Sequence, residues 1–222
     1  MSCRWLAVVW SATLCLAAYG QAPTMSLDRI DLLQRQGTSE AAITPVYSQV
    51  FLYALPDEFH TVGSGIVRKG HYAQQSVLAR ESLQRWTQMI TLSGDEALAF
   101  SGRTYPQKMI DDYGARMKKN CPDSFGALPL PGVFVGSYDT AVAVFSCGTS
   151  SGGQSESVLQ MVIKGGMDVY TLEWAVRGPP SRGPLKLDET QWTDRLRRLA
   201  PIRLCPVVAN EQPPFANCLR RR

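Results

Sequence analysis

The sequence predicts an α+β fold in which helices pack against a mainly antiparallel sheet. The predicted elements run in the order strands, two helices, strands and one helix, and such segregated runs are typical of this class. Gly165-Gly166 separates two strand-like segments and indicates a β-hairpin. In the second of these segments, residues 168–177, apolar and polar residues alternate, as expected for a sheet covered on one side. The composition, 45% apolar and 19% charged, excludes a disordered chain, a collagen-like repeat and a multi-span membrane protein.

The first twenty residues have the features of a secretory signal peptide. Arg4 precedes a short apolar run from Leu6 to Ala18, and small residues at Ala18 and Gly20 favour a cut after Gly20. We therefore expect export to the periplasm of a Gram-negative cell or to the medium; an uncleaved membrane anchor is the alternative. The mature chain would then consist of an N-terminal arm (21–44), an α+β domain (45–204) and a C-terminal tail (205–222).

Strands are expected in the first part of this domain. Composition rich in β-branched and aromatic residues predicts them at Val46–Leu55, Thr61–Lys69 and Tyr72–Leu78. Two helices should follow. In residues 82–90 the side chains of Leu83, Trp86 and Met89 recur at helical spacing. The next helix should begin at Thr104, which forms a capping box with Gln107.

The second part of the domain is predicted to return to strands and to end in a helix. The strands are expected at Thr140–Ser146, Ser157–Lys164 and Asp168–Arg177. Asp188 and Gln191 form a second capping box, and Pro201 ends the helix that follows. Three tryptophans lie at positions that face inward by period, so we expect a core containing Trp86, Trp174 and Trp192.

Four cysteines remain once Cys3 and Cys15 leave with the signal peptide. An even number in an exported chain indicates disulfides, and three pairings are open. We favour Cys121–Cys147 and Cys205–Cys218, because each joins sequential cysteines across a short segment. A zinc site is the weaker alternative, since no C-x-x-C pair and no adjacent histidine is present.

Residues Glu81 to Thr91, with the sequence ESLQRWTQMIT, resemble a motif of small exported bacterial proteins of unknown function with a PsbP-like fold. Residues Glu81 to Thr91 match the pattern E-x-L-x-x-W-T-x-M-[IL]-T, and Gly166-Met167-Asp168-Val169-Tyr170 is similar to the family's Gly-x-Asp-x-Tyr hairpin. The positions of the four cysteines agree with this likeness, which covers roughly residues 45 to 218. The resemblance implies an α/β/α sandwich around an antiparallel sheet. It brings no catalytic residues with it.

No enzyme motif is evident in the sequence, so we expect no catalytic residues, cofactor or metal. Neither Gly63-Ser64-Gly65 nor residues 148–152 has the G-x-S-x-G spacing of a hydrolase nucleophile. The net charge of +4 and the lack of interleaved aromatics also disfavour nucleic acid. We therefore expect a non-enzymatic binding or assembly protein with another protein as its partner. An immunity protein that blocks a secreted toxic enzyme and a hydrolase with a dispersed site are the alternatives.

Four side chains are candidates for partner binding. Arg195 and Arg198 belong to a basic helix face that could meet an acidic partner or, with weaker support, anionic lipid headgroups. His60 and His71 are the only histidines, and they would lie close together if their strands flank one turn.

Overall fold

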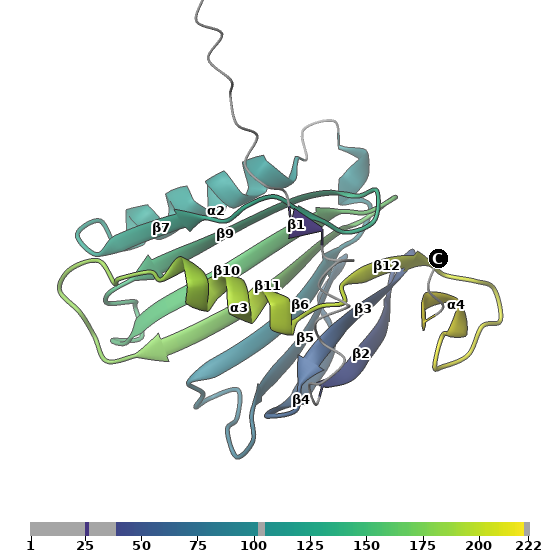
Figure 1. Ribbon diagram of the computed structural model, residues 1–222, viewed down its shortest axis with the longest axis horizontal. Helices are drawn as coiled ribbons and strands as arrows, with labels where there is room; N and C mark the ends of the chain where they lie inside the picture. The colour runs from purple at the N-terminus through teal and green to yellow at the C-terminus, as the bar shows by residue number, and fades with distance from the viewer. Residues whose placement is uncertain (1–24, 27–38, 102–104, 220–222) are drawn as a thin grey trace, which may run out of the picture.

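The computed structural model describes residues 25–26, 39–101 and 105–219, so the predicted signal peptide and Thr104 lie outside the described residues. It has the predicted α+β class (Figure 1). The elements are β1 (Met25–Ser26), β2 (Ser39–Val46), β3 (Gln49–Pro56), β4 (Phe59–Arg68), β5 (His71–Leu78), β6 (Gln88–Asp95), η1 (Leu98–Phe100), α2 (Pro106–Asn120), β7 (Phe125–Pro129), β8 (Val133–Phe134), β9 (Asp139–Cys147), β10 (Ser155–Lys164), β11 (Val169–Gly178), α3 (Glu189–Arg198), β12 (Arg203–Pro206) and α4 (Ala216–Leu219).

A seven-stranded sheet forms the centre of the molecule, in the order β4-β5-β6-β11-β10-β9-β7. Every neighbouring pair in it is antiparallel. The predicted hairpin at Gly165-Gly166 joins β10 to β11, where Lys164 lies opposite Val169. A second sheet, β12-β3-β2, is also antiparallel, whereas β1 pairs with β8 in parallel.

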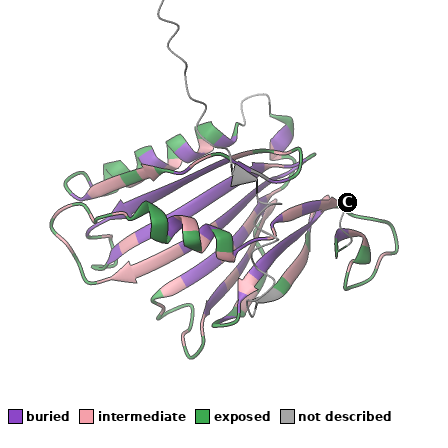
Figure 2. Cartoon of the chain, in the orientation of Figure 1, coloured by how far each residue is buried: buried purple, intermediate pink, exposed green. Residues whose placement is uncertain are grey.

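The two faces of the large sheet bury different layers. On one face, Trp192 and Leu196 of α3 and Phe51 and Tyr53 of β3 share a core with Trp174 of β11. On the other face α2 packs over β9 and β10, with buried side chains Ile110, Ala141, Ala143, Phe145 and Val162. Helices therefore cover both faces, and the outer sides of α2 and α3 are exposed while the strands between them are buried (Figure 2).

Both favoured disulfides are present, Cys121–Cys147 and Cys205–Cys218. The first joins the end of α2 to the end of β9. The second ties α4 to β12, so that Cys218 and Phe215 pack against Val50 of β3. The C-terminal tail is thereby held on the outer face of the small sheet.

The expected helix at residues 82–90 is wrong. This segment forms a turn in which Ser82 and Arg85 exchange backbone hydrogen bonds, followed by strand β6, which lies between β5 and β11. The Glu81 carboxylate accepts from the backbone N and the Oγ of Thr87, at 2.9 and 2.6 Å, and closes the turn. The helical spacing of Leu83, Trp86 and Met89 in the sequence is therefore a coincidence, because the chain forms a turn and then a strand here.

The structure corrects two further expectations. Trp86 is only half-buried, because it lies outside the core with its ring 3.6 Å from the Arg177 guanidinium. Trp174 and Trp192 are in the core as predicted. Helix α2 begins at Pro106 with Tyr105 at its N-cap, two residues after the predicted start at Thr104, which lies outside the described residues. The Asp188 cap of α3 is confirmed, since its carboxylate accepts from Gln191 N at 3.0 Å.

The small sheet begins inside the segment expected to be a loose arm. Strand β2 starts at Ser39, and a turn at Tyr47-Ser48 divides the single strand predicted over Val46–Leu55. Tyr47 adopts φ 53°, a backbone conformation that non-glycine residues rarely take outside turns. Strand β2, which pairs with β3 along its whole length, was not predicted because residues 21–44 are largely polar.

Strand β4 forms one end of the large sheet, and its pairing with β5 is irregular. The register shifts between Thr61 and Gly63 and again between Ile66 and Arg68. At the second shift, near the end of the strand, the side chains of Ile66 and Val67 are 60% and 63% exposed. This end of the sheet is therefore both apolar and bent out of regular pairing.

Candidate functional site

A surface cavity of about 380 Å³ lies between β12 and the connection from β8 to β9. Strand β12 is an outer strand of its sheet, so the cavity follows an edge that β3 does not cover. We call it the edge cavity. Its walls are formed by Val135, Gly136, Ser137, Tyr138, Ile202, Arg203, Leu204, Cys205, Pro206, Asn217 and Cys218.

The chain builds the two walls from local features. On one side the turn from Val135 to Tyr138 is closed by a hydrogen bond from Tyr138 N to Val135 O. Gly136 has φ 59° in this turn, a conformation that favours glycine. On the other side Leu204 turns inward to the shared core, while the disulfide holds α4 against Cys205. The cavity therefore has an apolar base and a polar rim.

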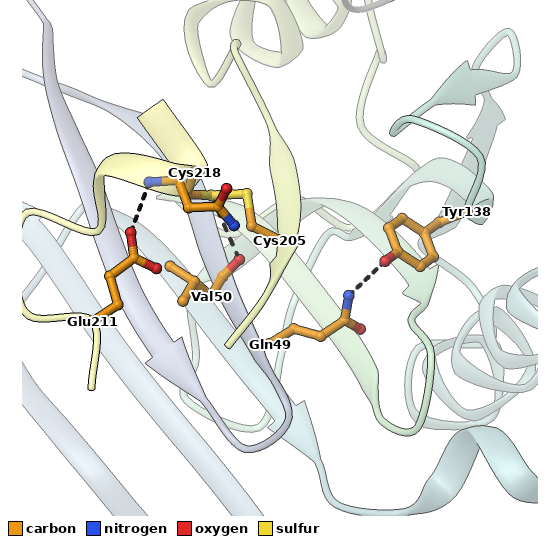
Figure 3. Close-up of a disulfide and its surroundings, with 7 residues drawn as sticks. Gln49, Val50, Tyr138, Cys205, Glu211 and Cys218 are labelled. Carbon is orange, nitrogen blue, oxygen red and sulfur yellow. Dashed lines mark hydrogen bonds between the residues drawn. A yellow bond between two sulfur atoms is a disulfide. The ribbon is translucent and has the colours of Figure 1, made fainter. Parts of the chain in front are cut away.

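Hydrogen bonds connect the rim to the rest of the protein (Figure 3). Gln49 Nε2 donates to the Tyr138 hydroxyl at 2.7 Å, and Gln49 Oε1 accepts from Gly166 N at 2.9 Å. The Tyr138 hydroxyl keeps its own proton available for another acceptor. In the tail, Asn217 N donates to Glu211 at 2.7 Å and orders the segment before Cys218. These hydrogen bonds hold the rim in place.

The structure brings together the two predicted arginines on α3. The Arg195 guanidinium lies 4.4 Å from the ring centre of Trp192, and that of Arg198 lies 5.2 Å from the ring of Trp174. Arg198 also forms an ion pair with Glu58. Burial and then the charge of Arg198 lower the pKa of Arg195. These stacked guanidinium groups cover the edge of the core, and both remain partly exposed.

The two histidines are not brought together. They lie on the paired strands β4 and β5 but at opposite ends, since His60 is opposite Val77 and His71 is opposite Arg68. His60 is exposed. His71 Nδ1 lies 2.7 Å from Asp95 Oδ1, which is a His–Asp pair of the kind found in hydrolase triads. Among the described residues, the hydrogen bonds of His71 join it to no serine, threonine or cysteine side chain.

A polar row on the α2 face of the large sheet was missed by the sequence analysis. Glu173 of β11 lies opposite Gln160 of β10 and Thr91 of β6, and Thr91 lies opposite Gln75 of β5. Gln160 Nε2 donates to Glu173 Oε1 at 3.1 Å. Alternation in β11 marks Glu173 as a residue of the polar face, but periodicity cannot show that it is half-buried and lies beside a glutamine of the neighbouring strand.

The helices within residues 25–26, 39–101 and 105–219 all lack the length and the apolar composition of a membrane-spanning helix. Within the same described ranges, no three His, Cys, Asp or Glu side chains lie close enough to hold a metal ion.

Comparison with known proteins gives distant structural likenesses, among them the following two. No protein-family model and no curated protein matches the chain. A crystal structure from Bacteroides thetaiotaomicron VPI-5482 aligns with 80% of this chain at 13% identity and a TM-score of 0.42; the chain spans about half, 51%, of that protein. LpqN, described as involved in cell envelope biogenesis of Mycobacterium tuberculosis, aligns over 83% of this chain and 100% of its own at 12% identity and a TM-score of 0.38. The fold class stated above comes from the strand order and not from these likenesses.

Proposed function

We propose that the protein is an extracytoplasmic, non-enzymatic binding protein whose site is the edge cavity. The observation that carries the proposal is a preformed cavity of about 380 Å³ braced by the Cys205–Cys218 bridge. This volume lies in the range of small-ligand sites, which combine apolar walls with a few placed polar groups. Ile202 and Leu204 supply such walls, and the Tyr138 hydroxyl supplies such a polar group.

The compartment is part of the same proposal. Two disulfides favour an oxidising location such as the periplasm or the medium, because cytosolic thiols are kept reduced. Residues 1–20 would be the cleaved signal peptide and Gln21 the first mature residue. The PsbP-like resemblance agrees with the α/β/α layering and remains part of this proposal. An immunity protein would use the same kind of site, whereas a hydrolase would need a nucleophile beside His71.

The occupant is a group of mixed polarity, carried by a free small molecule or by a segment of a partner protein. The apolar base fits an aliphatic or aromatic group, and the rim fits a hydrogen-bond acceptor facing Tyr138.

A dye-binding experiment tests whether the edge cavity takes up ligands. Anilinonaphthalene sulfonate joins an aromatic body to an anionic group and should bind the oxidised protein saturably. Ser137→Trp should abolish this binding, because Ser137 is an exposed residue of the cavity wall. Ser151→Trp is the matched control, since Ser151 is an exposed turn residue outside the cavity wall. Equal binding by wild type and Ser137→Trp would disprove the assignment.

A photo-crosslinking amino acid at position 137 separates the two sources of the ligand. Crosslinks to one protein, absent when the same amino acid stands at position 151, support a protein partner. If position 137 gives no specific crosslink in cells while the purified protein retains dye binding, the occupant is a free small molecule.

A further inference from the structure

The polar row on the α2 face contains a buried acceptor without a partner. Gln160 is only 7% exposed, and its Oε1 atom makes no hydrogen bond to any described residue. Its Nε2 atom is used, because it donates to Glu173 Oε1. A buried acceptor that lacks a donor costs free energy, so native proteins rarely leave one unpaired.

The residue beside this acceptor can supply the missing donor only in one state. An ionised carboxylate offers acceptors alone, whereas a protonated carboxylic acid has one O–H to donate. With a proton on Glu173, the acid and the amide can form two antiparallel hydrogen bonds, Gln160 Nε2–H to Glu173 and Glu173 O–H to Gln160 Oε1. Rotating the amide by 180° leads to the same requirement, because its oxygen would then face a carboxyl oxygen.

No free cation takes the place of that proton in the surroundings described. Glu156, on the same strand and face as Gln160, adds a second negative charge. Arg177 is engaged by Glu156 at 2.9 Å and by the ring of Trp86. From α2 the facing groups are Tyr113 and Arg116, whose guanidinium lies 5.7 Å from the Tyr113 ring.

The strands on the other side of Glu173 carry no charge next to it. Thr91 and Gln75 are its neighbours there, and the ionisable pair on this face of β5 and β6, His71 with Asp95, lies four residues farther along each strand. Burial raises the pKa of Glu173 to about 7; the Gln160 hydrogen bond opposes this shift, and the charge of Glu156 adds to it.

We propose that Glu173 and Gln160 form a proton-binding site in which a neutral acid–amide pair exists below neutral pH and a charged, singly bonded pair above it. Loss of the proton removes one hydrogen bond, orphans Gln160 Oε1 and places a negative charge on a partly exposed sheet face. The protein therefore carries a pH-responsive element on the face away from α3, independent of the edge cavity and of the function proposed for it.

The sign of the effect on stability follows from proton binding. The pKa of Glu173 is higher in the folded protein than the ordinary value of 4.5, so the folded state binds the proton more tightly. The stabilisation that proton binding by Glu173 gives to the folded state is fully present below about pH 4.5. It decreases as the pH rises toward the folded pKa of about 7 and stays constant above it.

Carbon-13 NMR of the glutamate carboxyl groups in the oxidised full chain measures this site directly. The carboxyl resonance of Glu173, assigned by through-bond correlations, should titrate with a midpoint near pH 7 instead of near 4.5. A midpoint at or below 5 would overturn the proposal. This measurement uses the wild-type protein and does not depend on any variant folding.

Two variants test the role of the amide–acid geometry. Glu173→Gln mimics the neutral acid at every pH. Between pH 5 and pH 8, the urea concentration at the midpoint of unfolding should therefore decrease less for this variant than for wild type. At pH 8 the variant should be at least as stable as wild type. Glu156→Gln is the control: it removes a neighbouring charge but should keep most of the pH dependence. Wild-type pH dependence in Glu173→Gln would contradict the proposal.

Discussion

Asp168 shows how one side chain joins segments that lie far apart in the sequence. It is 2% exposed, and its carboxylate accepts from Ser48 N at 3.0 Å, from Ser48 Oγ at 2.5 Å and from Ala97 N at 2.7 Å. The Tyr170 hydroxyl lies 3.3 Å from the same group and donates to Val46 O at 3.0 Å. The turn of the small sheet is thereby attached to the β10–β11 hairpin.

Replacing Asp168 should weaken the fold in a pH-dependent way. Burial alone would raise the pKa of Asp168, but the hydrogen bonds from Ser48, Ala97 and Tyr170 outweigh it and lower the pKa. We expect Asp168→Asn to cost roughly 2–3 kcal/mol at pH 7, because it loses hydrogen bonds to a charged acceptor. The native contribution is present above the unfolded pKa of about 3.9 and is lost as the pH falls through the folded pKa.

Urea unfolding of Asp168→Asn and wild type between pH 7 and pH 3 measures this effect. The difference in the free energy of unfolding between wild type and Asp168→Asn should become smaller as the pH falls toward 3. Asp139→Asn is the matched control, since Asp139 is exposed and should leave stability nearly unchanged. A constant gap across the whole pH range would contradict the role of the ionised carboxylate.

At the residue scale, the motifs that carried the family resemblance identify important residues without disclosing their roles. The Gly-x-Asp-x-Tyr motif contains Asp168 and Tyr170, which anchor the small sheet. The E-x-L-x-x-W-T motif contains Glu81 and Thr87, which close a turn. These partners come from distant strands or across a turn, so no local pattern in the sequence could have predicted them.

At the element scale, the contact between α2 and the sheet depends on a glycine. A Cβ atom on Gly114 would stand 2.6, 3.2 and 3.3 Å from three ring carbons of Phe145. That ring has little room to move, because Tyr113 and Phe125 lie 5.5 and 6.3 Å from it, centre to centre. The helix therefore lies close to the sheet only where it carries no side chain.

Gly114→Ala should destabilise the protein although alanine is the better helix former. The gain in helix propensity is about 1 kcal/mol. Forcing a methyl group into a packed core costs roughly 1–3 kcal/mol. We expect a net loss of about 1 kcal/mol in the free energy of unfolding. Gly132→Ala, where a Cβ would meet nothing within 4 Å, should change stability by less than about 0.5 kcal/mol. A more stable Gly114→Ala variant would contradict the packing argument.

Strand and helix prediction succeeded where periodicity and turn signals agreed, as in β10, β11 and α3. It failed at residues 82–90, where a turn closed by Glu81 and Thr87 mimicked helical spacing. It also missed β2 and β12, which are short of apolar residues or carry prolines and depend on β3 for their pairing. The edge cavity is formed by segments that are distant in the sequence. Of its features, only the Cys205–Cys218 disulfide could be predicted from the sequence.

At the scale of the whole molecule, the two sheets share one core. Phe51 and Tyr53 of the small sheet lie in the same cluster as Trp174 and Trp192, and the Phe51 ring is 5.8 Å from that of Tyr170. Unfolding of either sheet would expose apolar surface of the other. The two sheets are therefore expected to unfold together.

Oxidised protein should show a single unfolding transition in urea. The unfolding curve from tryptophan fluorescence, which reports Trp174 and Trp192 of the core together with the half-buried Trp86, should coincide with that from far-ultraviolet circular dichroism, which reports the strands and helices. The backbone amide hydrogens of β3 should then exchange with solvent as slowly as those of β11. Separate transitions, or fast exchange in β3 alone, would show that the small sheet is an independent unit.

The irregular strand β4 has a consequence for how copies of the protein behave at high concentration. An outer strand with regular pairing and exposed Ile66 and Val67 would offer a flat template for another chain. The two register shifts bend the backbone away from that geometry, so its N–H and C=O groups do not line up with a neighbour's. Remodelling β4 into a regular strand would thus favour edge-to-edge aggregation even if the monomer became more stable.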